Sequence, residues 1–522
     1  MKTISGLVSL FSRGFIIAIF CSCSTNESYV GAYQAKNDNV GSYTSDIERS
    51  FRSYEGPARN PVIVIHGFLG SKLKNSDNDN NVWGLFTGSD VFDGYTDEYL
   101  RDLSYPMAYG RELKDIKDYV VPYEFMSDAE IRIVGITIDQ SAYREMLDVL
   151  ISMGFVTENM LVQEKKKLPS LFTFYYDWRR TNVENVRQLH EFIFKKRAFL
   201  QKRYEEEYGI KDFDVQFNII AHSMGGMITR YYLMYGNKPL ASEPVPSWEG
   251  CKYVERVIIV GTPNLGFLNT CFELTEGLQV APGMPIIPPA IIGTWASIYQ
   301  MIPFACTNSV VYSDDPSGKS VNLYDPEAWK NLKWGLADPA QDQYLQVLLP
   351  DVKTPEARRK IALDHLEKCL KEAENFAKAL QIESEMPGKT ALFLFLGDSV
   401  NTRKKASVDR LTGKLETIVY DGGDGIALST SARMDTVQPE YWKPFVSSCV
   451  RWHTVVHLNA DHMGITDSHG FEDNVPYYLM ITPVKGDIER IRYLKKILGN
   501  SQKYMKNFQT FNKEQVLSHT SQ

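Results

Sequence analysis

A serine in a short glycine-containing turn is the residue of this sequence whose surroundings best fit nucleophilic chemistry. Ser223 lies in His222-Ser-Met-Gly-Gly226, between an apolar run ending at Ala221 and a helical pattern that continues to Tyr235. A nucleophilic serine on a sharp strand-to-helix turn needs small residues two places before it and two places after it. Ala221 and Gly225 occupy those places. We therefore predict that Ser223 is a nucleophile; the alternative is a serine that only caps the helix.

Two backbone amides are predicted to stabilise the negative charge that attack by this serine creates. One is the N–H of Met224, directly after the serine. The other is the N–H of Phe68, in the turn His66-Gly-Phe68 that follows an earlier apolar strand. An oxyanion hole of this kind takes one amide from each of these two places.

The serine also needs a general base, and the sequence contains only nine histidines. His462 follows the last apolar strand in the loop Asp461-His-Met-Gly-Ile465. An imidazole in such a loop can reach back to the serine, so we predict that His462 is the base. His457 is the alternative, although the strand pattern places it in the core or at a sheet edge.

An acidic partner for the histidine is expected between the serine and the histidine in chain order. Asp424, in the loop Asp421-Gly-Gly-Asp-Gly425, is preferred, because glycines let a carboxylate approach an imidazole closely. Asp421 and Asp398 remain alternatives. The same loop also fits a hairpin turn or a calcium loop, and Asp77-Asn-Asp-Asn-Asn81 gives a weak calcium signal. We predict no metal site and no cofactor.

Apolar strands that alternate with helical segments predict a mainly parallel sheet with helices around it. The predicted strands are 61–66, 171–176, 215–221, 254–260, 391–396 and 448–458. Residues 183–208 and 355–382 are predicted to be long helices. The Pro-rich, aromatic stretch 264–340 interrupts the alternation.

With these motifs in place, the sequence resembles the lecithin–cholesterol acyltransferase family of α/β-hydrolases. Four segments carry the resemblance: Pro61–Leu73 with Val82-Trp-Gly84, Tyr176–Arg179, His222–Gly226 and Gly423–Gly425. The resemblance implies an α/β fold with a cap or lid insertion, and acyl-ester chemistry on lipids by hydrolysis or by transfer to an alcohol. That family usually has proline at the position of His66. A histidine at this position is closer to ordinary bacterial lipases. Tyr176–Arg179 is interpreted as a structural brace.

The resemblance also implies a layout for the chain. Residues 59–480 are expected to form one catalytic domain with a cap at about 264–385, followed by a C-terminal helix and tail at 481–522. The apolar segment 282–292, with Trp295, Tyr299 and Phe304, fits either an acyl channel or the packed core of the cap.

The N-terminus has the pattern of an export signal. Lys2 and Arg13 precede a short apolar run, and Cys21-Ser-Cys23 follows it. We predict a signal segment at 1–23 and a polar tether at 24–58. Two alternatives stay open: acylation of Cys23 with lipid anchoring in the cell envelope, or a plain signal and secretion.

The composition disfavours some of the remaining classes of function. The 522 residues include 57 basic and 64 acidic side chains, for a net charge of −7, which disfavours a nucleic-acid partner. Seven scattered cysteines form no CxxC pair. The sequence thus predicts a serine esterase, lipase or phospholipase acting on a lipid or other ester, with no obligate protein partner inferred. A lipid O-acyltransferase is the first alternative, and a binding protein on an inactive hydrolase scaffold is the second.

Overall fold

A computed structural model describes most of the chain from residue 56 to residue 501. The described residues are 56–87, 94–133, 136–141, 143–162, 168–281, 284–315, 318, 320–438 and 445–501. The predicted signal segment with Cys23, nearly all of the predicted tether and the end of the predicted tail lie outside them. The folded part already includes a short helical turn, Gly56–Ala58, in which Pro57 is buried. It therefore extends slightly ahead of the predicted boundary at residue 59.

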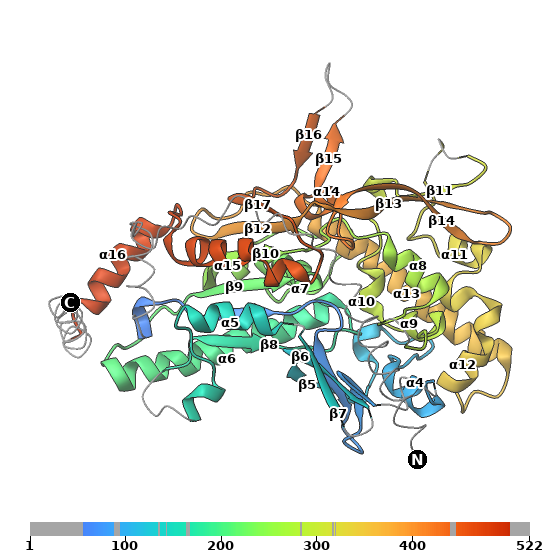
Figure 1. The fold of residues 1–522 in the computed structure, drawn as a ribbon, viewed down its shortest axis with the longest axis horizontal. Helices are drawn as coiled ribbons and strands as arrows, with labels where there is room; N and C mark the ends of the chain where they lie inside the picture. Colours follow the sequence, from blue (N-terminus) through green and yellow to red (C-terminus); the bar gives the residue numbers. More distant parts are fainter. Residues whose placement is uncertain are drawn as a thin grey trace, which may run out of the picture.

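A six-stranded parallel sheet forms the centre of the molecule, which confirms the predicted α/β fold (Figure 1). In spatial order the strands are β17 (Thr454–Leu458), β12 (Ala391–Gly397), β10 (Val254–Val260), β9 (Phe217–His222), β1 (Val62–Ile65) and β8 (Leu171–Phe174). The four inner strands are buried along nearly their whole length, as expected for strands covered on both faces. All these strands end at the same edge of the sheet, where loops can meet.

Helices cover both faces of this sheet. Ile220 and Ile258 point to the face packed by α5 (Arg144–Ser152) and α15 (His469–Pro476). Their neighbours Ile219 and Ile259 point to the opposite face, which is packed by α6 (Asn182–Tyr208) and α7 (Met224–Tyr235). Alternate residues of each strand thus bury against different helices, because successive side chains of a strand point in opposite directions.

The two long helices agree with their predicted ranges because their ends carry clear stop and start signals. The side chain of Thr181 caps the start of α6, and Gly209 ends it in the left-handed region with φ 69°. Thr354 caps α13 (Pro355–Leu380), whose first residue is a proline.

Residues 261–390 form an insertion between β10 and β12, which pair directly with each other. It contains β11 (Val310–Tyr312) and six α-helices: α8 (Asn269–Glu276), α9 (Pro289–Ile292), α10 (Ala296–Tyr299), α11 (Pro326–Leu332), α12 (Asp342–Leu348) and α13. These helices gather at one end of the molecule, beside α4 (Asp97–Leu103) (Figure 1). Trp295, Tyr299 and Phe304 are fully buried, so they belong to the packed core of this region.

Smaller sheets surround the centre. Residues 71–141 contribute β2 (Ser71–Asn75), β3 (Asn81–Trp83), β4 (Leu85–Thr87), β5 (Val120–Phe125), β6 (Asp128–Ile133) and β7 (Ile136–Ser141). The other two sheets hold the hairpin of β13 (Val400–Val408) and β14 (Leu415–Gly423), and that of β15 (Asp435–Gln438) and β16 (Phe445–Ser448). The predicted strand 448–458 is therefore partly wrong, since its first residue belongs to a separate hairpin and β17 starts at Thr454.

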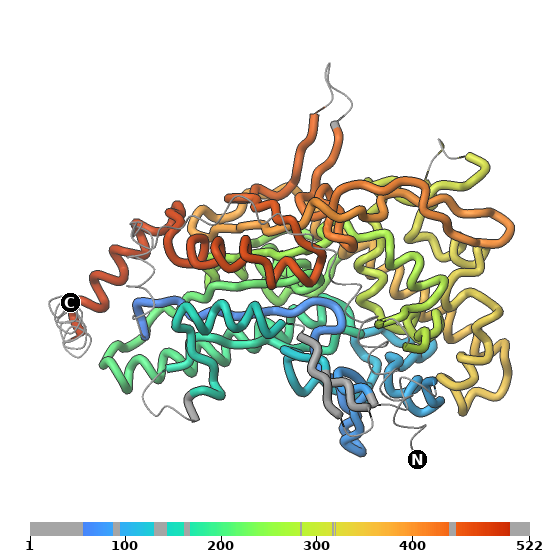
Figure 2. Tube along the Cα trace, viewed as in Figure 1, coloured from blue at the N-terminus to red at the C-terminus, as the bar shows by residue number. Residues whose placement is uncertain are grey.

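The chain ends of the described part lie together. Figure 2 shows α16 (Asp487–Leu498) beside the beginning of the described chain. No described helix is both long enough and apolar enough to span a bilayer. Within the described ranges the five cysteines, at 251, 271, 306, 369 and 449, are unpaired.

Candidate active site

Ser223 occupies a strained turn between β9 and α7. Its φ of 53° and ψ of −126° are unusual for a residue with a side chain, and such strain is typical of functional positions. Close packing explains the small residues around it. A Cβ on Gly225 would lie 2.3 Å from the main-chain oxygen of His66, and one on Gly226 would lie 2.0 Å from Thr262 Oγ1. The Thr262 hydroxyl also donates a hydrogen bond to the Ser223 main-chain oxygen at 2.8 Å.

His462 reaches this serine from the loop that follows β17. Its Nε2 lies 3.0 Å from Ser223 Oγ, and its Nδ1 lies 2.8 Å from Asp424 Oδ2. Because an ionised carboxylate only accepts hydrogen bonds, Nδ1 carries the proton and Nε2 is free to accept the serine hydroxyl proton. Sequence reasoning placed these three residues together, and the structure brings them into one hydrogen-bonded chain.

Asp424 is held by the loop that follows β14. Its Oδ2 faces His462, while its Oδ1 accepts hydrogen bonds from the amides of Ile426 (2.9 Å) and Ala427 (2.6 Å). The carboxyl side chain is only 1% exposed. Glycines permit this approach: a Cβ on Gly397 would lie 2.8 Å from Asp424 Cβ. The acid therefore has both oxygens occupied and a fixed orientation.

The alternative residues lie in other contacts. Asp398 and His457 form their own exposed pair, with 2.5 Å between Oδ2 and Nδ1. The Asp421 carboxylate accepts a hydrogen bond from Lys404 Nζ at 2.7 Å, and this contact lowers the pKa of Asp421. The geometry thus favours Asp424 and His462 over these alternatives as partners of the serine.

The two predicted oxyanion amides border Ser223. A Cβ on Gly67 would lie 2.6 Å from Ser223 Cβ, so the His66-Gly-Phe68 turn approaches the serine as closely as backbone can. Among the described residues the Phe68 N–H has no acceptor. Met224 is the first residue of α7, so its N–H has no partner within the helix. Two amide donors are therefore free beside the serine oxygen.

Asp77–Asn81 is the segment whose sequence gave a weak calcium signal. Lys74 Nζ lies 2.6 Å from the Asp79 carboxylate, which therefore already has a cationic partner. No group of three His, Cys, Asp or Glu side chains comes together within the part of the chain that the structure describes.

A comparison with models of protein families finds a match for part of this chain. Residues 124–333 match the model of the family described as lecithin:cholesterol acyltransferase. Over this segment the chain is similar to that family. This finding confirms the predicted resemblance and supports an enzyme of the lipase or esterase type. A search of curated proteins gives no match.

Solved structures agree with this fold. The crystal structure of the Tle4–Tli4 complex matches with a TM-score of 0.51 and 14% identity, over 81% of this chain and 98% of that chain. Phospholipase PlaB from Legionella pneumophila matches with a TM-score of 0.33 and 12% identity, over 69% of this chain and 62% of that one. EstA from Clostridium botulinum gives 0.29 and 14%, over 83% and 90%. The first of these carries the fold comparison.

A buried hydrogen-bond chain that sequence reasoning missed links the oxyanion turn to the loop that carries His462. The Gly67 N–H donates to the Tyr143 hydroxyl at 2.8 Å, and that hydroxyl lies 3.1 Å from His222 Nδ1. His222 Nε2 lies 3.0 Å from the main-chain oxygen of His462. A carbonyl oxygen only accepts, so Nε2 carries the proton and Nδ1 accepts from the Tyr143 hydroxyl.

Burial keeps His222 neutral in this chain of bonds. Desolvation, together with the nearby His462, lowers the pKa of His222 to about 3. The neutral ring therefore connects the oxyanion turn to the loop that carries His462. His222 was visible inside the serine motif, whereas nothing in the sequence signalled Tyr143, which immediately precedes α5.

His66, the departure from the family pattern, is a packed structural residue. Its ring stacks on Tyr176 with 4.1 Å between centroids, and its Nδ1 donates to the Gly67 main-chain oxygen at 2.7 Å. Burial lowers the pKa of His66 to about 3. Nearby, Arg179 is buried against the carboxylates of Asp177 and Asp118, in line with its interpretation as a brace.

Proposed function

We propose that this protein is a serine hydrolase that cleaves carboxylic esters, with Ser223, His462 and Asp424 as its catalytic residues. The observation that carries this proposal is the continuous contact from Ser223 Oγ through His462 to a buried Asp424, next to two free amides. Hydrogen-bonded Ser-His-Asp chains perform nucleophilic acyl transfer on several unrelated folds.

Each residue has a defined part in the proposed reaction. Ser223 Oγ bonds to the ester carbonyl carbon while its proton passes to His462 Nε2. The carbonyl electron pair moves onto oxygen, where the Phe68 and Met224 amides stabilise the charge. Collapse of this intermediate breaks the bond to the alkoxy oxygen, which leaves with the proton from His462 as an alcohol. Asp424 holds the ring and stabilises its positive charge in between.

The acyl-enzyme is then resolved by a second nucleophile. Water attacks the acyl carbon, gives its proton to His462, and the carboxylic acid leaves as Ser223 regains its proton. The lecithin:cholesterol acyltransferase match supports a lipid ester as substrate, in agreement with the exposed Met463 beside the base. The same match favours a second candidate, an O-acyltransferase in which a lipid alcohol replaces water.

Covalent labelling tests the proposed nucleophile. A fluorophosphonate probe should label the full chain, and Ser223→Ala should abolish labelling while the protein stays folded. Unlabelled but folded wild-type protein would instead favour the inactive-scaffold alternative. Product analysis on lipid esters, with and without an added sterol or glycerol, separates hydrolysis from acyl transfer: a free acid supports the hydrolase, and a new ester supports the transferase.

We further propose export of the protein, with acylation of Cys23 as the route to membrane attachment. The proposal rests on the Lys2 and Arg13 charges, the short apolar run and the Cys21-Ser-Cys23 boundary. Metabolic labelling with a radioactive fatty acid tests it in a host with a lipoprotein pathway. Label that is incorporated into the wild type and lost in Cys23→Ser supports acylation, whereas unlabelled exported protein supports a plain signal.

A further inference from the structure

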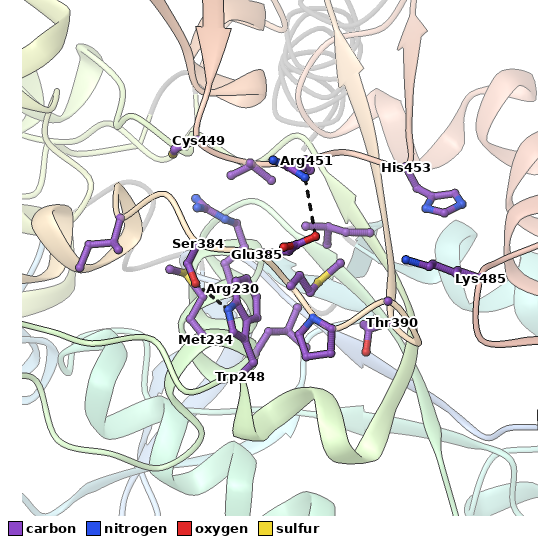
Figure 3. A pocket seen from close by; sticks show the side chains of 17 residues that line it. Arg230, Met234, Trp248, Ser384, Glu385, Thr390, Cys449, Arg451, His453 and Lys485 are labelled. Carbon is purple, nitrogen blue, oxygen red and sulfur yellow. Dashed lines mark hydrogen bonds and ion pairs between the residues drawn. The ribbon is translucent and has the colours of Figure 1, made fainter. Parts of the chain in front are cut away.

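A cavity of about 170 Å³ lies beneath α7, away from Ser223. Figure 3 shows it with Arg230, Met234 and Trp248 on one side and His453 and Lys485 on the other. It is bordered by the amino-terminal ends of β12 and β17, whereas Asp424 and His462 lie near the carboxyl-terminal ends of these strands. The cavity is therefore separate from the candidate active site.

The walls of this cavity combine apolar surface with positive charge. Its apolar side chains are Leu233, Met234, Trp248, Ile382, Met386, Pro387, Leu392 and Val450. Its charged side chains are three cations, Arg230, Arg451 and Lys485, and one carboxylate, Glu385. Glu385 lies 3.9 Å from Arg451 and is 84% exposed, so it neutralises only one cation, at the rim. A surplus of positive charge remains in a protein whose net charge is −7.

Arg230 is the unusual member of the lining. It is only 3% exposed, yet it forms no ion pair with a carboxylate in the described part of the chain. Its guanidinium donates to Asn264 Oδ1 at 3.0 Å and to the main-chain oxygen of Leu380, the last residue of α13, at 2.8 Å. Burial lowers the pKa of Arg230 to about 10, which leaves it charged at neutral pH.

Neutral hydrogen-bond acceptors leave the positive charge of a buried guanidinium without a counter-charge. The carboxyl end of α13 offsets some of the charge through the helix dipole, but a buried cation is normally paired with an anion. A guanidinium has five N–H donors and binds carboxylates with a matching fork. Lys485 adds a second, exposed cation on the opposite side of the cavity.

We propose that this cavity binds a small amphipathic carboxylate, with its charged group toward Arg230 and its apolar part against Met386 and the other apolar walls. An apolar cavity of about 150 Å³ accommodates benzene, so the volume here suits an apolar part of about six carbons. The eight apolar wall residues disfavour a purely polar anion such as inorganic phosphate.

Titration with carboxyl-labelled hexanoate tests the proposal on the full chain. We expect saturable binding, followed by the ¹³C chemical shift, that is unchanged in Ser223→Ala. 1-Hexanol should bind at least about tenfold more weakly, because it lacks the charge. Inorganic phosphate should not compete. Equal binding of hexanol would overturn the role of Arg230, and competition by phosphate would overturn the role of the apolar walls.

Substitutions of lining residues test whether hexanoate binds in this cavity. Met386→Trp fills the space and should abolish hexanoate binding, and Lys485→Gln should weaken it about three- to tenfold, in proportion to a charge at the rim. Lys389→Gln is the matched control, since Lys389 is an exposed neighbour outside the lining. Arg230→Gln should abolish binding, with thermal unfolding measured in parallel. If Arg230→Gln lowers the melting temperature while the wild type binds no hexanoate, Arg230 only joins α7 to α13 and the proposal is wrong.

Discussion

The imidazole of His222 lies 3.0 Å from the main-chain oxygen of His462, so the residue before the candidate nucleophile contacts the loop that carries the candidate base. The same ring contacts the Tyr143 hydroxyl, which in turn accepts a hydrogen bond from the Gly67 N–H. The buried His222 side chain therefore connects three parts of the candidate active site: the serine, the loop of the base and the oxyanion turn.

Replacing His222 tests this relationship. His222→Phe removes both hydrogen bonds, and we expect kcat on a soluble ester to fall about 10- to 100-fold, because small displacements of reacting groups are costly. KM should change little, since His222 does not face the substrate. Tyr143→Phe removes one hydroxyl and should have a smaller effect. A folded His222→Phe enzyme with wild-type kcat would show that the contact positions nothing.

Asp424 and Asp398 can be separated by matched substitutions. Asp424→Asn keeps the shape of the side chain but removes the charge that fixes the His462 tautomer, so we expect kcat to fall about 10⁴-fold. Asp398→Asn and His457→Gln disrupt only an exposed pair and should leave kcat within about twofold. Steady-state kinetics on one ester compares the three. A large loss in Asp398→Asn would reassign the acid.

Gly67 is predicted to tolerate no side chain. A Cβ there would lie 2.6 Å from Ser223 Cβ, so Gly67→Ala must displace either the serine or the oxyanion turn. We expect at least about a 100-fold loss of activity. Gly110→Ala is the control: its φ of 69° strains an alanine, but nothing lies within 4 Å of the added atom. It should lower stability by about 1–2 kcal/mol and leave kcat unchanged.

Three buried histidines predict loss of stability in mild acid. Burial lowers the pKa of His66 and His222 to about 3 and that of His365 to about 4, from an ordinary value of 6.5. Below pH 6.5 the unfolded chain binds protons that the folded chain does not. Each histidine then lowers the free energy of unfolding by up to about 1.4 kcal/mol per pH unit.

Urea unfolding at several pH values checks this dependence. Burial raises the pKa of Glu273 and Glu372 to about 7, which changes stability in the opposite direction, so the comparison with a histidine variant carries the test. Between pH 7 and about 4.5, His222→Gln should gain stability relative to the wild type as pH falls. His469→Gln is the matched control, because the His469 side chain is 99% exposed and folding hardly removes it from water. The same pH dependence in the wild type and in His222→Gln would contradict the buried neutral state of His222.

Local signals explain why much of the site could be predicted from the sequence. The serine motif is defined by its small residues and by the strand and helix on either side, and these features lie within about twenty residues. The order of Ser223, Asp424 and His462 along the chain then restricts the search to a few candidates. Parallel strands end at one edge of the sheet, so loops that follow them meet there.

Contacts between distant segments could not be predicted in this way. Tyr143 immediately precedes α5, 79 residues from His222, and no local pattern connects them. The short strands within 71–141 pair outside the central sheet, where apolar periodicity is weak. Ser448 and Thr454 were assigned to one strand because both segments favour extended backbone, yet pairing with β15 separates them.

The unpaired cysteines matter for how this protein can be prepared. Burial raises the pKa of Cys251 and Cys271 to about 12, so both stay protonated and react slowly with oxidants. Cys306 is exposed and is the thiol most open to forming links between molecules during storage. Handling with a reductant present should therefore keep Cys306 from forming such links.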